Sequence, residues 1–223
     1  MNAAVVAGGA LELSARILRA VQRADLLIAA DSGARHLPAL GRGADLLIGD
    51  FDSFDPGDPG DPGDPGDPGA VEIVRFPTVK DQTDLHLAVR EAVRRGATSV
   101  VLLAALRGPR LDHGAANLLL LSAGEFAGLE LRALDGPDEL RAVRTSAEIA
   151  GAAGDLVTLL AVTRTASGVS TEGLVYPLHE ATLRRGDSRG VSNALEGDRG
   201  GVRLRRGVLL LIHREGGDPN AIR

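Results

Sequence analysis

The chain has 223 residues, and its 44% hydrophobic and 25% charged residues are typical of a globular protein with one large domain or two modest ones. Its net charge of −5 is accounted for by the five aspartates of an Asp-Pro-Gly repeat at 55–69, so the remainder is nearly neutral and its charge gives no clue to partners. The chain has no cysteine, which excludes disulfides, thiolate metal sites and cysteine nucleophiles.

Predicted strands and helices alternate through the first part of the chain. Apolar runs predict strands at 3–7, 26–30, 46–48, 71–76, 99–106 and 129–134, and segments with helical periodicity predict helices at 11–23, 34–40, 81–95 and 114–122. Such alternation is typical of a mostly parallel sheet covered by helices on both faces. We therefore predict a three-layer α/β nucleotide-binding domain at 1–136.

The pattern changes after residue 136. Short apolar runs without helical periodicity lie at 140–144, 156–162, 174–178, 202–204 and 208–213, separated by turn-forming residues. Such runs predict a smaller C-terminal all-β sandwich, which we place at 137–215, followed by a loose tail at 216–223. The repeat at 55–69 predicts an extended, disordered insertion outside the chemistry, because proline removes backbone donors and glycine loosens the chain.

Two carboxylates follow the predicted strand at 46–48. Gly49 lets the chain leave the sheet, and the alternation of an extended chain then points Asp50 and Asp52 to the same side. Two carboxylates at such a short distance repel each other unless a cation lies between them. Mg²⁺ is a suitable cation because it prefers oxygen ligands. The pattern predicts a magnesium site, and an acidic turn whose side chains bond the backbone is the alternative.

Further polar residues follow the first two predicted strands. Gly8 and Gly9 form either a phosphate-binding turn, in which backbone N–H groups approach the ligand, or a plain tight turn. Asp31 and Ser32 end the second strand, and Asp31 is either a helix N-cap or a further metal ligand.

A third cluster begins the predicted helix at 81–95. Asp81 and Asp84 share a face at a spacing of three and would form a capping box, which needs no functional explanation. Lys80 is the only lysine among 25 basic residues, and a lone ammonium beside carboxylates suggests a point charge for a phosphate.

A fourth cluster follows the most hydrophobic strand. Arg110 offers a planar fork to phosphate oxygens, Asp112 would hold that arginine, cap a helix or bind metal, and His113 is either a base or a capping residue. Carboxylates and a few cations at one sheet edge are the chemistry of Mg²⁺ and a polyphosphate.

Five motifs in this order resemble those of the thiamin pyrophosphokinase family. They are Asp31-Ser32-Gly33-Ala34, Gly49-Asp50-Phe51-Asp52-Ser53, Lys80-Asp81-Gln82-Thr83-Asp84, Arg110-Leu111-Asp112-His113 with Asn117, and Gly190-Val191-Ser192-Asn193. The resemblance implies that ATP, the co-substrate, gives its pyrophosphoryl group to the hydroxyethyl oxygen of thiamine, which forms thiamine diphosphate and AMP. It also implies a homodimer.

The resemblance implies roles for particular residues. Its implied magnesium ligands are Asp31, Asp50, Asp52 and Asp84, and Ser192 and Asn193 of the β domain would help to bind thiamine across a dimer interface. Together with the reasoning above, the expected catalytic residues are Asp50, Asp52, Asp81, Asp84 and Arg110. The expected substrate-binding residues are Gly8, Gly9, Asp31, Ser32, Lys80, Thr83, Arg110, Asp112, Ser192 and Asn193. Asp81 and Asp112 are candidates for a general base, between which the sequence does not choose.

The chain departs from the family at Pro109, where a glycine is usual, and proline removes one backbone donor near the phosphates. Tyr176 and His179 are the candidates for the ring that the family often places near thiamine. One alternative is transfer to another hydroxyalkyl heterocycle such as a pterin, and a second is a non-catalytic nucleotide or thiamine-phosphate sensor. A third is an interaction module that works through the repeat at 55–69.

The sequence also bears on location and on macromolecular partners. No apolar run approaches the roughly 20 residues that span a bilayer, and the first residues lack the features of a signal peptide. Aromatic residues make up only 2% of the chain, which argues against a stacking platform for single-stranded nucleic acid. We therefore expect a cytoplasmic protein with small-molecule substrates and neither a membrane nor a nucleic-acid partner.

Overall fold

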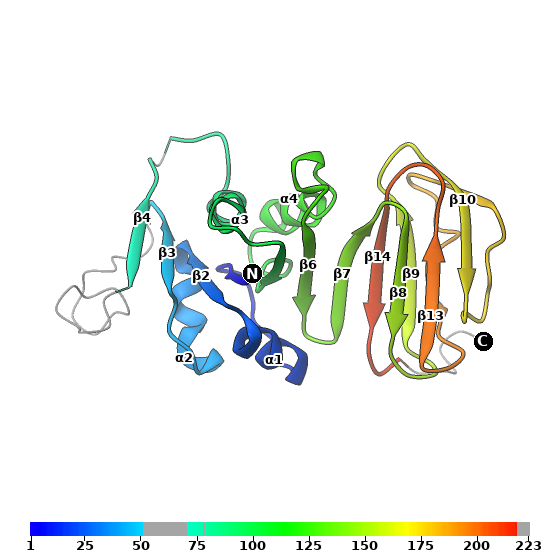
Figure 1. The fold of residues 1–223 in the computed structure, drawn as a ribbon, viewed down its shortest axis with the longest axis horizontal. Helices are drawn as coiled ribbons and strands as arrows, with labels where there is room; N and C mark the ends of the chain where they lie inside the picture. The colour runs from blue at the N-terminus through cyan, green and yellow to red at the C-terminus, as the bar shows by residue number, and fades with distance from the viewer. Residues whose placement is uncertain (51–70, 78, 218–223) are drawn as a thin grey trace. The chain divides into compact units, whose positions relative to one another are not determined.

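The computed structural model describes residues 1–50, 71–77 and 79–217 (Figure 1). The chain divides into two compact units, Met1–Gly136 and Pro137–Arg223. The predicted magnesium ligand Asp52 and the Asp-Pro-Gly repeat lie outside the described residues, as do residues 218–223 of the predicted tail.

Unit 1 contains a six-stranded parallel sheet in the order β6-β5-β1-β2-β3-β4. The strands are β1 (Asn2–Val6), β2 (Leu26–Ala30), β3 (Leu46–Gly49), β4 (Glu72–Arg75), β5 (Ser99–Leu103) and β6 (Glu130–Asp135). The first four strands follow one another in one direction from β1, whereas β5 and β6 lie on the other side of β1. The order therefore reverses between β1 and β5, and such a switch point is where open α/β sheets bind ligands, at the carboxyl ends of the strands.

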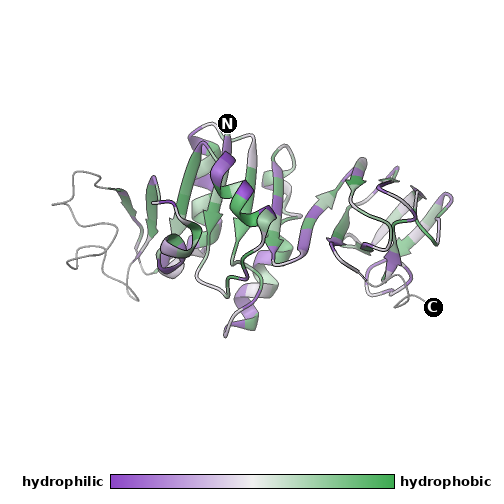
Figure 2. Ribbon diagram, turned by 90° about the horizontal axis from the view of Figure 1, so that it is seen from below, coloured by the Kyte–Doolittle hydropathy of each residue, from purple (hydrophilic) through white to green (hydrophobic). Residues whose placement is uncertain are grey.

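Helices cover both faces of this sheet, which confirms the predicted α/β class. They are α1 (Ala15–Arg23), α2 (Leu37–Leu40), α3 (Asp84–Arg94) and α4 (Leu111–Leu120), with 3-10 turns η1 (Asp31–His36) and η2 (Gly124–Phe126). One face packs on α1 and α2 through a core that includes Ala4, Ile17 and Leu47, and α3 contacts β1, β2 and β3. Figure 2 shows the strands as largely hydrophobic and the helices as hydrophilic on one side. No helix of the described chain is long and apolar enough to cross a membrane.

Two predicted helices differ from expectation in where or how they begin. The helix predicted at 11–23 starts at Ala15, because the Ser14 side chain caps it by accepting from the N–H of Ile17. The helix predicted at 34–40 is a 3-10 turn that begins at Asp31 and passes into the short α2, where Pro38 lies in the first turn.

Unit 2 is an antiparallel β-sandwich, as predicted, with sheets ordered β12-β9-β14-β7 and β11-β10-β13-β8. The strands are β7 (Asp138–Val143), β8 (Ser146–Ala150), β9 (Leu156–Ala161), β10 (Thr165–Glu172), β11 (Ala181–Arg184), β12 (Asn193–Ala194), β13 (Arg199–Arg203) and β14 (Leu209–Arg214). Inward-facing residues of both sheets, such as Ile149, Val169 and Leu211, form one core.

The prediction of a strand at 174–178 is wrong. Only Leu174 makes an isolated bridge there, to Leu195, and Pro177 interrupts the segment. The sequence patterns missed β8, β10, β11 and the two-residue β12. In β10 a register shift between Ser167 and Val169 breaks the alternation of inward and outward residues that identifies a strand.

Candidate active site

A cavity of about 560 Å³ lies where β1, β2, β3 and β5 of unit 1 end. This volume lies within the range of small-molecule sites. Of the predicted site residues, its lining includes Gly8, Gly9, Asp31, Ser32, Asp50, Thr83, Asp84 and Arg110. The fold thus brings together, at the switch point of the sheet, residues as far apart in the chain as Gly8 and Arg110.

The turn after β1 packs tightly against the loop after β5. The N–H of Gly9 donates to the Ala104 carbonyl at 2.9 Å and that of Ala10 to the Arg107 carbonyl at 2.6 Å. A Cβ on Gly9 would lie 2.3 Å from both carbonyl oxygens, and one on Gly8 would lie 2.1 Å from Ser32 Oγ. The neighbouring loop uses the N–H of Gly9, so this donor favours the tight-turn alternative, and close approach is a sufficient reason for a glycine at position 9.

Two side chains of η1 form hydrogen bonds with the carbonyl groups of the same turn. Arg35 donates to the Gly8 carbonyl, and His36 Nε2 lies 2.8 Å from the Gly9 oxygen. Burial lowers the pKa of His36 and outweighs the opposite effect of this hydrogen bond, so the ring is neutral near pH 7 and donates from Nε2. The sequence patterns did not single out either side chain, because both contacts depend on packing between distant segments.

Asp31 lies at the end of β2 with a φ of +47°, a left-handed conformation that non-glycine residues seldom adopt. It is the first residue of η1 and is not an N-cap, because the N-cap position belongs to Ala30. A Cβ on Gly49 would lie 3.2 Å from the Asp31 Cα, so Asp31 and the end of β3 lie against each other. This contact brings Asp31 to the strand end that carries Asp50.

Lys80 joins two of the predicted metal ligands. Its Nζ lies 3.0 Å from Asp50 Oδ2 and 2.9 Å from Asp84 Oδ1, and its side chain is only 13% exposed. Burial alone would lower the pKa of Lys80, but the hydrogen bonds and charges of the two carboxylates outweigh it and raise that pKa. The side chain of Lys80 is therefore a protonated ammonium group that lies between Asp50 and Asp84.

Asp81 does not begin α3, so the predicted capping box is wrong. Thr83 is the N-cap, and its Oγ1 accepts from the N–H of His86 at 3.3 Å. Asp84 occupies the first helical position and faces the cavity, whereas Asp81 is exposed and does not belong to the lining. The two aspartates therefore do not share a helix face.

Arg110 and Asp112 pair with each other at the start of α4. Two hydrogen bonds of 3.0 and 2.7 Å join them, although both side chains are more than 60% exposed. The hydrogen bonds from Arg110 hold the pKa of Asp112 down to about 2. Exposed pairs are weak, so a phosphate could replace the carboxylate beside Arg110. His113 lines the cavity from the next position of the helix.

Two further side chains hold the loop that follows β5. Arg107 donates two hydrogen bonds of 2.8 Å to Asp135 and one of 2.7 Å to Glu12. The buried Asn117 of α4 donates to the Ala105 carbonyl at 2.7 Å. The role of Arg107 was not expected from the sequence, because nothing in the pattern distinguishes it among the many arginines of the chain.

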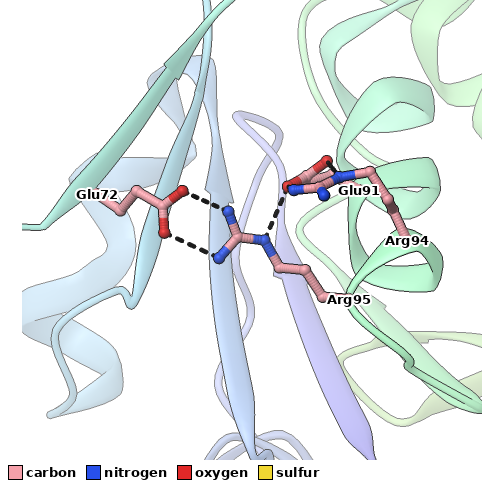
Figure 3. A network of polar contacts seen from close by, with 4 residues as sticks. All are labelled: Glu72, Glu91, Arg94 and Arg95. Atoms are coloured by element: carbon pink, nitrogen blue, oxygen red, sulfur yellow. Dashed lines mark hydrogen bonds and ion pairs between the residues drawn. The ribbon is translucent and has the colours of Figure 1, made fainter.

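A network at the other end of α3 ties it to the edge strand β4 (Figure 3). Glu91 accepts from Arg94 at 2.7 and 2.6 Å and from Arg95 at 2.8 Å, and Arg95 also forms a two-bond pair with Glu72 of β4. Figure 3 shows the Arg95 guanidinium between the two glutamates. The network therefore ties together the two elements, β4 and α3, that the segment carrying Lys80 connects.

The donor set fits a magnesium ion in its chemistry. Asp31, Asp50 and Asp84 supply hard oxygen donors to one cavity, as Mg²⁺ requires. In the described part of the chain, however, no three His, Asp or Glu side chains form a group that could hold a metal ion as they stand. Lys80 occupies the position between two of these carboxylates.

The residues predicted to bind thiamine lie in unit 2. Asn193 Oδ1 accepts from the N–H of Tyr176 at 3.0 Å, and its Nδ2 donates to the Tyr176 carbonyl at 2.7 Å. Ser192 has a φ of +59°, and its N–H donates to Thr158 Oγ1 at 3.1 Å. The Asn193 side chain therefore fixes the backbone of Tyr176, whose ring is half exposed.

A pocket of about 270 Å³ lies beside these residues. Its lining combines aliphatic side chains with one aromatic ring, one guanidinium and one amide, and consists of Leu159, Tyr176, Pro177, Leu178, Arg189, Gly190, Val191 and Asn193. A Cβ on Gly190 would lie 2.1 Å from the Leu159 carbonyl, which explains the glycine at that position. Ser192 and His179 do not belong to the lining.

The two units define a class of protein in which a parallel α/β domain with an acidic, arginine-rimmed cavity precedes a β-sandwich with a small amphipathic pocket. Comparison with protein families gives the same division. Residues 17–132 match the model described as "Thiamin pyrophosphokinase, catalytic domain", and residues 144–209 match "Thiamin pyrophosphokinase, vitamin B1 binding domain". The chain belongs to the thiamin pyrophosphokinase family, which confirms the resemblance seen in its motifs.

Individual relatives support this assignment. The chain is 24% identical over 210 residues to the thiamine pyrophosphokinase of Bacillus subtilis, which covers 93% of this chain and 96% of the relative. The crystal structure of thiamine pyrophosphokinase from the same species superposes with a TM-score of 0.80 at 23% identity, covering 96% of this chain and 99% of the other. The thiamin pyrophosphokinase from Candida albicans gives a TM-score of 0.76 at 14% identity, covering 96% and 88%. At such identities the structural matches establish the fold.

Proposed function

We propose that this chain transfers the pyrophosphoryl group of ATP to the hydroxyethyl oxygen of thiamine, which forms thiamine diphosphate and AMP. The observation that carries the proposal is that both parts of the family, catalytic and vitamin B1 binding, match in order. Each match overlaps a unit that has its own cavity.

On the donor side, the cavity of unit 1 suits the polyphosphate of ATP. Asp31, Asp50 and Asp84 would hold Mg²⁺, with Asp52 as the further ligand expected from the sequence. Bound there, the ion would neutralise phosphate charge and polarise the phosphoryl oxygens. Arg110 lies at the same cavity in a weak exposed pair, so its guanidinium can turn to a phosphate oxygen.

In the reaction the hydroxyl oxygen of thiamine attacks the β-phosphorus, and the bond from that phosphorus to the oxygen of the α-phosphate breaks as AMP leaves. The hydroxyl proton passes to solvent water as the new bond forms. Asp112 is a weak base because Arg110 holds its pKa down to about 2, and Asp81 lies outside the cavity lining. We therefore assign catalysis mainly to positioning and to neutralisation of charge.

On the acceptor side, the pocket of unit 2 offers a ring and aliphatic groups to the heterocycles of thiamine. Tyr176 supplies the ring, and Asn193 positions it through two hydrogen bonds to the Tyr176 backbone. We include the homodimer implied by the family in the proposal. Light scattering after size-exclusion chromatography would test it, and a monomer at all concentrations would contradict it.

The decisive assay measures AMP release from ATP and Mg²⁺ with and without thiamine, together with the mass of the thiamine product. Thiamine-dependent AMP with matching thiamine diphosphate supports the proposal. AMP release that depends on a pterin and not on thiamine would redirect it to another acceptor, and ATP binding without any transfer would indicate a sensor.

Asp50→Asn should reduce turnover by ~10²-fold or more, because it removes one carboxylate from the charge-neutralising set. The exposed Asp198 of unit 2 provides the matched control, and Asp198→Asn should retain turnover. Circular dichroism would check that both variants fold. Full turnover in Asp50→Asn would contradict the donor site described above.

A further inference from the structure

Lys80 occupies the position in which a cation would be expected at this site. Its ammonium group lies 3.0 Å from Asp50 and 2.9 Å from Asp84, and the side chains of these residues are 11% and 22% exposed. It is also the chain's single lysine, and all other members of the 25 lysines and arginines are arginines. A compact ammonium replaces a hydrated metal ion between two carboxylates more readily than a planar guanidinium does.

A divalent ion and this ammonium group compete for the same oxygens. Mg²⁺ binds carboxylate oxygen at about 2.0–2.1 Å in an octahedral shell. With the ammonium still near 3 Å from both oxygens, the two cations would repel each other strongly in a poorly exposed site. Binding of one of these cations to the carboxylate oxygens therefore disfavours binding of the other.

We propose that Lys80 is an exchangeable counter-ion, which holds Asp50 and Asp84 together in the metal-free protein and is displaced by the divalent cation that these carboxylates bind. This inference rests on the metal site of the proposed function. The displaced ammonium remains beside the cavity, because Lys80 lies three residues before Thr83 of the lining, and it then binds an oxygen of the polyphosphate. One side chain thus neutralises carboxylates without substrate and phosphate with substrate.

The single lysine allows a direct test on the unaltered protein. Protein labelled with [¹³Cε]-lysine should give one side-chain resonance, and Mg²⁺ without nucleotide should move it in a saturable manner. Potassium chloride at equal ionic strength should not move it. A resonance that stays in place at Mg²⁺ concentrations that saturate the protein by calorimetry would overturn the proposal.

Two variants test the competition through binding alone. Lys80→Met removes the resident cation, so the variant should bind Mn²⁺ about tenfold more tightly than the wild type without nucleotide. It should bind the Mn²⁺–ATP complex more weakly, because the ammonium–phosphate contact is lost. Opposite changes for these two ligands would not result from a merely structural loss. The matched control, Lys80→Arg, keeps the charge and should not tighten binding of Mn²⁺ alone.

Unchanged, weaker or undetectable binding of Mn²⁺ to folded Lys80→Met would overturn the proposal, and circular dichroism would establish folding. Failure of this inference is distinguishable from failure of the proposed function. Thiamine-dependent AMP formation without the binding changes rejects only the exchange. Displacement of Lys80 by Mg²⁺ without AMP formation rejects only the transfer reaction.

Discussion

Ionisation of Glu91 should make the unfolding free energy of unit 1 depend measurably on pH. Its side chain is only 10% exposed and accepts hydrogen bonds from Arg94 and Arg95. These interactions, with Arg94 contributing most, outweigh burial and lower the Glu91 pKa from its ordinary 4.5 to about 2. That difference corresponds to at most ~3 kcal/mol of unfolding free energy, and solvent screening at the exposed Arg94 reduces it to ~2 kcal/mol.

The sign follows from the direction of the pKa change. Because the folded state holds Glu91 ionised, the stabilisation is complete above the unfolded-state pKa of about 4.5 and declines as the pH falls toward 2. Glu91→Gln should therefore be less stable than the wild type by ~2 kcal/mol at pH 7. More than half of that difference should be lost by about pH 3.

Urea unfolding of both proteins at pH 7, 4.5, 3.5 and 3, followed by circular dichroism, measures this difference directly. Subtracting the variant from the wild type cancels the carboxylates that they share. Glu130→Gln, at an exposed glutamate that begins β6, is the matched control and should give a small difference at every pH. A difference for Glu91→Gln that stays constant or grows on acidification would refute the reasoning.

Two further predictions concern the loops at the cavity. Gly9→Ala should lower the unfolding free energy by several kcal/mol and remove most of the turnover, because its Cβ would lie 2.3 Å from the Ala104 oxygen. The matched control is Gly43→Ala, whose Cβ would lie in open space. Its unfolding free energy should be within ~1 kcal/mol of that of the wild type. Urea unfolding would measure both, and a stable Gly9→Ala protein would contradict the packing described. Asn117→Ala leaves the buried Ala105 carbonyl without this donor and should cost ~1–3 kcal/mol and raise the KM for ATP. An unchanged KM would show that this bond does not position the loop.

Much of unit 1 could be predicted because each strand is short, apolar and followed by a break. The Leu46–Gly49 strand and the aspartate after it show how local this signal is, and the same reasoning correctly located Asp31 and Asp84 at strand or helix ends. Parallel strands that share one direction then bring such ends to the same edge. The sequence therefore predicted the residues that line the cavity better than it predicted their partners.

The partners could not be predicted because they depend on contacts between distant segments. No local pattern indicates that Gly9 donates to Ala104 or that Lys80 reaches Asp50 across 30 residues. Capping was misassigned for a related reason. Asp81 and Thr83 are both good caps, and the path of the chain into α3 selects Thr83.

Unit 2 was harder because the strands that were missed carry few large apolar residues. In β10 the inward positions include Ala166 and the left-handed Gly168, which give little hydrophobic signal. Conversely, the run at 174–178 is apolar because Tyr176 and its neighbours line a pocket, which sequence periodicity cannot distinguish from a strand.

The way in which the two pockets are built has a consequence for how such a protein can evolve. The lining of the unit 1 cavity includes a place where backbones touch, since a Cβ on Gly9 would lie 2.3 Å from two carbonyl oxygens. A side chain at such a position would require the backbone to move, so we expect substitutions there to destabilise the fold and to be seldom tolerated. The unit 2 pocket is lined by side chains such as Tyr176, Leu178 and Val191, two of which are substantially exposed. Substitutions that accumulate during evolution should therefore change the acceptor specificity of the unit 2 pocket before they change the nucleotide specificity of the unit 1 cavity.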